Sequence, residues 1–109
     1  MIQVTIYKNT RDCFRGFVIS GHAGYADRGK DIICASVSAL SLNFINSVER
    51  FTEDGFQTEC QEEKGILRFK FQGAVSKQSI LLMESMILGI QNIRDSYGEK
   101  YVNIRFKEV

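Results

Sequence analysis

The chain has 109 residues, 44% of them hydrophobic and 25% charged, with a formal net charge of +1. This length fits one domain with a single core over residues 1–109, and the near-neutral charge gives no electrostatic reason to expect direct binding of nucleic acid or of an anionic membrane. Three cysteines without a C-x-x-C pair argue against a disulfide framework and a cysteine-rich zinc site, and no apolar run approaches the roughly 18 residues that span a bilayer, so we expect a cytoplasmic protein with free thiols and no cofactor.

Two strands are predicted at the start of the chain. Ile2, Val4 and Ile6 alternate with less apolar residues, which indicates a strand with one buried face. A polar break follows at residues 8–12, and residues 14–20 then offer aromatic and β-branched side chains. This pattern predicts a hairpin of two strands.

A loop and a long helix follow the hairpin. Residues 21–30 contain three glycines among small residues, so their backbone can adopt conformations that most residues avoid. Asp31 is well placed as the N-cap of a helix, since a carboxylate there accepts hydrogen bonds from the amides of the first turn. We expect Gly55 to close this helix in a left-handed conformation. Apolar residues recur along it at spacings of three and four: Ile33, Val37, Leu40, Phe44, Val48 and Phe51.

The second half of the chain shows another hairpin, helix and strand. Residues 56–61 and 67–71 alternate on either side of a turn at residues 62–65. Ser76 or Ser79 can cap a second helix, which Gly98 stops. A final strand alternates at Val102, Ile104 and Phe106. The predicted apolar stripe of the second helix is Met83, Met86, Ile87, Ile90, Ile93 and Tyr97.

The order ββαββαβ, with amphipathic helices and one-sided strands, favours an α/β two-layer sandwich. In this architecture both helices cover one face of a mixed five-stranded sheet. Basic residues on the strands, such as Arg68 and Lys70, are then expected on a solvated face, because acidic residues dilute them and no aromatic ladder lies between them.

Cys34 is the first candidate for chemistry. With Asp31 as N-cap it is the third helical residue, where the free amides and the helix dipole are expected to lower the thiol pKa. The amides of Ile33, Cys34 and Ala35 are candidate oxyanion donors. Cys34 lies on the flank of the apolar stripe, beside Ser38 and Ser41, so it need not be buried.

His22 is the only histidine, and it follows the predicted end of the second strand. The end of that strand and the start of the helix meet at one edge of the sheet, so His22 and Cys34 can come together. A cysteine with a nearby imidazole is the minimal nucleophile and base of a thiol hydrolase. A buried cysteine is more often a small hydrophobe, however, and spacing alone leaves both interpretations open. Cys60 is predicted to face the helices as part of the core, and Cys13 to lie beside a polar turn.

The segment Gly21-His22-Ala23, followed by Gly29-x-Asp31-Ile32-Ile33-Cys34-Ala35 and by Val37-Ser38-Ala39-Leu40, closely resembles the signature of the ribosomal-processing cysteine proteases called Prp. The similarity in layout extends over the whole chain. This resemblance implies a cytoplasmic endopeptidase that removes a short N-terminal extension from ribosomal large-subunit protein twenty-seven during ribosome assembly. It also implies a homodimer, and a preference for aromatic or aliphatic residues before the scissile bond and a small residue after it.

The resemblance further assigns residues. His22 and Cys34 match the catalytic dyad, and residues 23–30 match a mobile flap that moves to admit a peptide. Asp31 falls on a matching position where it orients His22 or only caps the helix. Ser38 also matches, and either bonds the substrate backbone or keeps the helix surface small. Gly21 and Gly29 serve the loop conformation first and substrate contacts second.

Two other hypotheses compete with the protease. Residues 24–31 nearly match a phosphate-binding P-loop, but Asp31 stands where that motif needs Ser or Thr to hold magnesium. A non-catalytic ribosome-assembly or RNA-binding module is the other alternative. RNA binding that falls steeply with salt, together with full function after Cys34→Ala, would favour it.

Overall fold

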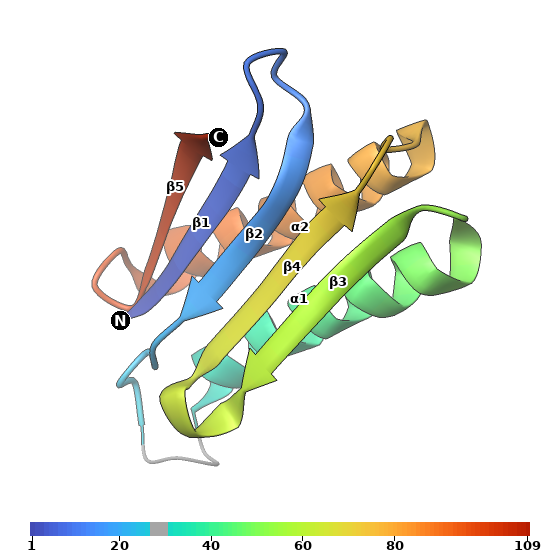
Figure 1. Cartoon of the computed structure of the whole chain (residues 1–109). Helices are drawn as coiled ribbons and strands as arrows, with labels where there is room; N and C mark the ends of the chain where they lie inside the picture. The colour runs from blue at the N-terminus through green and yellow to red at the C-terminus, as the bar shows by residue number, and fades with distance from the viewer. Residues whose placement is uncertain (27–30) are drawn as a thin grey trace.

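Five strands form one mixed sheet, and two helices cover one of its faces (Figure 1). This computed structural model describes residues 1–26 and 31–109. The sheet order is β3-β4-β2-β1-β5, in which β1 and β5 pair in parallel and the other neighbours are antiparallel. The predicted fold class and element order are confirmed. The elements are β1 (Ile2–Lys8), β2 (Phe14–Ser20), α1 (Ile32–Phe51), β3 (Gly55–Gln61), β4 (Ile66–Gln72), α2 (Lys77–Tyr97) and β5 (Val102–Glu108).

The core lies between the sheet and the helices. Alternating strand residues such as Val4 and Ile6 are fully buried, as the period of two predicts. Phe17 of β2 stacks on Phe69 of β4 with ring centroids 5.4 Å apart, and Phe44 of α1 meets Phe69 edge-on at 5.0 Å. These aromatic contacts fix α1 across β2 and β4, and so set the place of the helix start relative to the strand ends.

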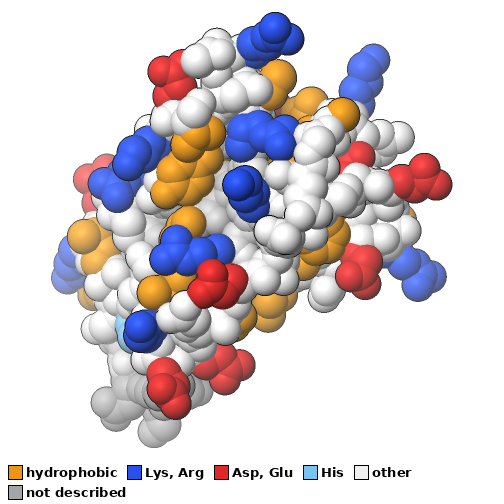
Figure 2. All heavy atoms as spheres, in the orientation of Figure 1, with side chains coloured by type: hydrophobic (Ala, Val, Ile, Leu, Met, Phe, Trp, Pro, Cys, Tyr) orange, Lys and Arg blue, Asp and Glu red, His pale blue; other side chains and the backbone are white. Residues whose placement is uncertain are grey.

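The opposite face of the sheet has no helix on it. Arg68 and Lys70 alternate with the buried Phe69 on β4, so they point away from the helices. Figure 2 views this face and shows Lys and Arg side chains spread over the strands, with fewer acidic ones. Glu59 of β3 lies 3.8 Å from Arg68, and both are exposed. This is the solvated face that the sequence predicted.

The start of α1 is capped as predicted. Asp31 Oδ1 accepts hydrogen bonds from the backbone amides of Ile33 and Cys34, each at 3.0 Å. The predicted end at Gly55 was wrong, because Gly55 already belongs to β3. Thr52 closes the helix instead: its amide and its hydroxyl both donate to the carbonyl of Val48.

By length and composition alone, α1 is the one helix in the described parts of the chain that could cross a membrane. The same property belongs to core helices of globular folds. Here the apolar side of α1 packs into the core through Ile33, Val37, Phe44 and Val48, which are all buried. The apolar composition therefore has a structural cause within the fold.

A short 3-10 turn, η1 (Glu62–Lys64), joins β3 to β4, and α2 lies beside α1. Ser76 caps α2 by accepting a hydrogen bond from the amide of Ser79, and Gly98 ends it. Three residues of the expected apolar patterns are exposed: Phe51 and Tyr97 at the last positions of α1 and α2, and Phe106 on the edge strand β5. The packing between the sheet and the helices does not reach these three side chains, so they lie outside the core.

Candidate active site

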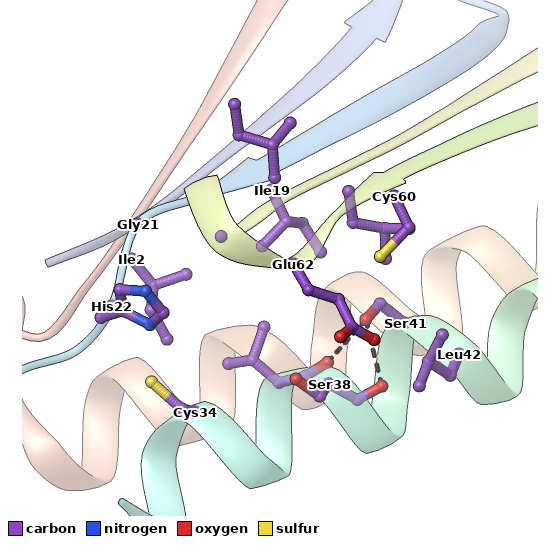
Figure 3. A pocket seen from close by; sticks show the side chains of 14 residues that line it. Ile2, Ile19, Gly21, His22, Cys34, Ser38, Ser41, Leu42, Cys60 and Glu62 are labelled. Atoms are coloured by element: carbon purple, nitrogen blue, oxygen red, sulfur yellow. Dashed lines mark hydrogen bonds between the residues drawn. The ribbon is translucent and has the colours of Figure 1, made fainter. Parts of the chain in front are cut away.

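His22 and Cys34 lie at the same edge of the sheet, from two different elements. His22 follows the end of β2, and Cys34 stands in the first turn of α1. Figure 1 shows the end of β2 and the start of α1 at the same edge of the sheet. Both line a groove of about 300 Å³ between α1 and the β3–β4 turn. Figure 3 shows the imidazole of His22 and the sulfur of Cys34 at the same end of this groove. The sequence predicted that a strand end and a helix start would bring these two residues to one edge of the sheet. The structure has this arrangement.

The walls of this groove are mainly apolar. Its floor and sides come from the ends of β1, β2 and β4 and from one face of α1, while Glu62 of η1 lies at its rim (Figure 3). Leu42 is half exposed there, at 50%, and offers its side chain to any bound chain. The apolar side chains that line the groove are Ile2, Ile19, Val37, Leu42, Ile66 and Leu67.

Cys34 also lines a second hollow, of about 420 Å³. Gly24, Ala26 and Asp31 contribute to it. His22, Cys34 and Ser38 line both spaces, so the thiol stands where the groove and the second hollow meet. An extended peptide that occupied both would pass its backbone over the sulfur.

The Cys34 thiol is half-buried and accepts a hydrogen bond from the amide of Ala23, with 3.2 Å between N and Sγ. Burial raises the pKa of this thiol, the Asp31 carboxylate raises it further, and the Ala23 amide acts in the opposite direction. The predicted lowering of the pKa by the helix start was therefore wrong. Burial of the thiol is the main reason, and the cap adds to it by placing a negative charge among the first amides of α1.

The predicted oxyanion donors are also occupied. The amides of Ile33 and Cys34 bind Asp31 Oδ1, and the amide of Ala35 donates to the Asp31 carbonyl oxygen at 3.1 Å. The amide that does point at the sulfur belongs to Ala23, which the sequence did not single out. The only indication of this amide in the sequence was that Ala23 directly follows His22.

Asp31 holds two segments together. Besides capping α1, its Oδ2 accepts a hydrogen bond from the amide of Tyr25 at 3.2 Å. In the described residues its carboxylate accepts from backbone amides and not from His22. Burial alone would raise the pKa of this carboxyl, but hydrogen bonds from Cys34, Tyr25 and Ile33 hold it below its usual value. Capping and anchoring are thus the roles visible in the structure.

The remaining predicted site residues differ in what they contribute. Gly21 has φ +88°, and a β-carbon there would lie 2.5 Å from the carbonyl oxygen of Met1, so its backbone conformation and its close approach both need glycine. Ser38 is exposed on the groove, whereas the Ser41 hydroxyl is buried and donates to the carbonyls of Val37 and Ser38. Gly29, with the rest of residues 27–30 in the predicted flap, lies outside the described residues.

The other two cysteines are exposed. Cys13 lies in the turn between β1 and β2, as predicted. The prediction of Cys60 as a core residue was wrong: it lies on the helix-facing side of β3 but lines the groove. β3 is an edge strand, and here the helix layer leaves it uncovered. Within residues 1–26 and 31–109, no three His, Cys, Asp or Glu side chains gather as a metal site.

Comparison with known proteins identifies relatives along nearly the whole chain. A sequence model of the family described as cysteine protease Prp matches residues 1–103. The ribosomal processing cysteine protease Prp of Bacillus subtilis is 30% identical over 105 residues, which cover 91% of this chain and 92% of that protein.

Solved structures share the fold. The essential ribosomal processing protease Prp of S. aureus, in complex with a covalently linked product peptide, superposes with a TM-score of 0.91 at 22% identity, covering 98% of this chain and 100% of that one. The same protease in complex with a substrate peptide gives a TM-score of 0.87 at 21% identity, with the same coverage of both chains. At these identities the match establishes the architecture.

Proposed function

The chain belongs to the Prp family of ribosomal processing cysteine proteases, and from this premise we propose that it cleaves its substrate with His22 as base and Cys34 as nucleophile. The substrate we propose is the N-terminal extension of ribosomal large-subunit protein twenty-seven. The enzyme would act in the cytoplasm as a homodimer, as the resemblance of its signature implies.

The observation that carries this proposal is the place of the two side chains. Both His22 and Cys34 line the groove and the second hollow, so they stand at the junction of two spaces. An endopeptidase needs room for substrate on both sides of the bond that it cleaves. The complexes of the S. aureus relative with peptides are consistent with such a groove.

The chemistry follows from the surroundings of the thiol. Because burial and Asp31 raise the pKa of Cys34, the thiolate is scarce near neutral pH unless a base removes the proton. In the proposed mechanism the imidazole of His22 accepts this proton, the sulfur attacks the carbonyl carbon, and the imidazolium returns the proton to the leaving amine. Water then hydrolyses the thioester and restores the thiol.

The backbone amide of Ala23 supplies a hydrogen bond in this step. Its amide already donates to Sγ, so it stabilises negative charge on the sulfur as the proton leaves. Since Asp31 occupies the amides of Ile33 and Cys34, we expect the Ala23 amide to serve the developing oxyanion as well. No reorganisation of the helix start is then required during the reaction.

The groove supports a substrate with large apolar side chains. Its apolar walls would remove aromatic or aliphatic residues from water, each worth about 1.5–3 kcal/mol when fully buried. Such residues before the scissile bond are the preference that the resemblance implies. A small residue after the bond would lie toward the second hollow, next to Gly24 and Ala26.

The test is cleavage of a synthetic peptide that covers the extended N-terminus of the ribosomal protein. We expect the wild type to cleave this peptide at one site. Cys60→Ser, which replaces another thiol of the same groove, should cleave it in the same way. Cys34→Ser and His22→Ala should each slow the reaction by about 1,000-fold or more, since nucleophile and base act as a unit. An intact peptide with the wild type, or undiminished cleavage by Cys34→Ser, would contradict the proposal.

A further inference from the structure

Gly65, which the sequence marks only as a turn residue, lies directly against the imidazole of His22. A β-carbon built on Gly65 would lie 3.0 Å from Nε2 and 3.2 Å from Cε1 of His22. Both distances are shorter than the separation of about 3.5–4.0 Å that non-bonded heavy atoms prefer. The ring thus occupies the space that a side chain at position 65 would fill.

The backbone holds Gly65 in this place from two directions. Gly65 follows η1 in the left-handed conformation, with φ 61° and ψ 42°, and its amide donates to the carbonyl of Glu62 at 3.1 Å. Its own carbonyl accepts a hydrogen bond from the amide of Gly21 at 3.0 Å. The β3–β4 turn is therefore bonded to the residue that directly precedes His22.

We propose that Gly65 is a positioning residue for His22: its missing side chain lets the imidazole lie over the β3–β4 turn and beside Cys34. This inference rests on the proposed role of His22 as base. The His22 side chain is exposed, so a methyl group at position 65 has an easy way to be accommodated, which is displacement of the ring. Proton transfer requires heavy atoms within about 2.6–3.2 Å, so displacement of the ring hinders the approach to the sulfur that the proposed reaction needs.

Gly73 offers a matched control at the other end of β4. It also has a positive φ, +83°, but a β-carbon there would meet no atom within 4 Å. Gly65→Ala and Gly73→Ala therefore introduce the same kind of backbone strain, while only the first places a methyl group against His22. Gly65→Asn adds a second variant, because Asn tolerates the left-handed conformation and still carries a β-carbon.

The experiment uses the fact that His22 is the only histidine in the chain. NMR of the imidazole therefore reports on this one ring. We expect the imidazole resonances to shift in Gly65→Ala and Gly65→Asn, and to match the wild type in Gly73→Ala. In cleavage of the extension peptide we expect kcat to fall up to about 10-fold in both Gly65 variants. The ring must give by a few tenths of an ångström, and a misplacement of about 1 Å costs on the order of 100-fold.

Two results overturn the proposal: a wild-type imidazole signal in both Gly65 variants, or an equal loss of kcat in Gly73→Ala. Thermal unfolding identifies any variant that does not fold, and Gly65→Asn then carries the comparison. The proposed function fails separately, if His22→Ala cleaves the peptide at the wild-type rate. In that case the NMR comparison still decides whether Gly65 places the ring.

Discussion

The amide of Ala23 donates a hydrogen bond to the sulfur of Cys34 at 3.2 Å. Ala23 is buried, at 4% exposure, and directly follows His22, so this bond links the proposed nucleophile to the segment that carries the proposed base. Residues 21–25 are fixed at three further points: the Gly21 amide on Gly65, the Tyr25 amide on Asp31, and the Tyr25 ring on two tyrosines. The geometry of the site thus depends on contacts that lie outside the dyad.

Asp31→Asn tests the electrostatic part of this arrangement. Asn is as good an N-cap as Asp, but it removes the negative charge that raises the pKa of Cys34. A nearby negative charge disfavours the thiolate, so its removal must lower the pKa. We expect the pH midpoint of Cys34 alkylation by iodoacetamide to move to lower pH in the variant, measured by mass spectrometry of the Cys34 peptide.

Cys13 and Cys60 supply internal controls for this titration, because both are exposed thiols in the same sample. The extent of alkylation of these two cysteines at each pH should be the same in Asp31→Asn and in the wild type. A Cys34 midpoint that stays constant or rises in the variant would show that Asp31 does not set the thiolate population.

Tyr97→Ala tests the anchoring of the segment after β2. The ring of Tyr25 meets Tyr97 edge-on at 5.6 Å and Tyr101 edge-on at 5.3 Å, and such pairs contribute about 0.5–1.5 kcal/mol each. We expect faster hydrogen–deuterium exchange in the peptide containing Ala23 and Tyr25 when Tyr97 is replaced by Ala. Tyr97→Phe keeps the ring and should exchange like the wild type, so equal exchange in all three proteins would rule out this anchor.

Local patterns predicted most of the fold. The cap at Asp31, the cap at Ser76 and the alternation of β1 each depend on residues close in sequence, and each is present. The predictions failed where the burial of a side chain depends on whether a helix packs over its strand. Cys60 has the alternation of a core residue, but β3 is the edge strand and the helices do not cover it at that point.

The candidate site was predictable in its two main residues and less so in their surroundings. His22 and Cys34 stand at a strand end and a helix start, which local patterns place at one edge of the sheet. The same cap that positions Cys34 also occupies the amides expected to bind an oxyanion, and this follows only from the Asp31 side-chain geometry. The contact between His22 and Gly65 spans two strands in the sheet order, β2 and β4, so nothing in the local sequence indicates it.

Leu42→Asn tests the groove as the binding site for apolar side chains. Leu42 lines the groove and is 50% exposed, so its replacement removes apolar contact surface without opening the core. For the extension peptide we expect KM to rise about 10-fold with kcat little changed, because a lost apolar contact of about 1–2 kcal/mol affects binding of ground state and transition state alike. Leu88→Asn is the matched control, since Leu88 is 58% exposed on α2 and does not line the groove. A similar rise in KM for Leu88→Asn would argue against a specific role of the groove.

Ser79→Ala tests a partly buried cluster that joins the start of β3 to α2. Asp54 accepts hydrogen bonds from the Ser79 hydroxyl and from the amide and hydroxyl of Ser76. Burial by itself would raise the pKa of Asp54, but these bonds hold it below its usual value. Ser79 is fully buried, so its loss should lower the free energy of unfolding at neutral pH by about 1–3 kcal/mol, measured by urea denaturation.

The pH dependence of stability gives this cluster a signature of its own. A carboxyl whose pKa is lower in the folded chain stabilises the fold above its unfolded pKa of about 4, and this contribution is lost as the pH falls toward the folded value. The wild type should therefore lose stability between about pH 5 and pH 3, and Ser79→Ala should lose less over the same interval, because part of the shift in Asp54 has gone. Some slope remains in the variant, since the pKa of Asp31 is lowered as well.

Ser36→Ala is the control for this measurement. It removes a hydroxyl that donates a hydrogen bond to the carbonyl of Ile32, so it should leave the pH dependence of stability unchanged. Parallel curves for the wild type and Ser79→Ala would mean that the Asp54 cluster does not couple protonation to folding.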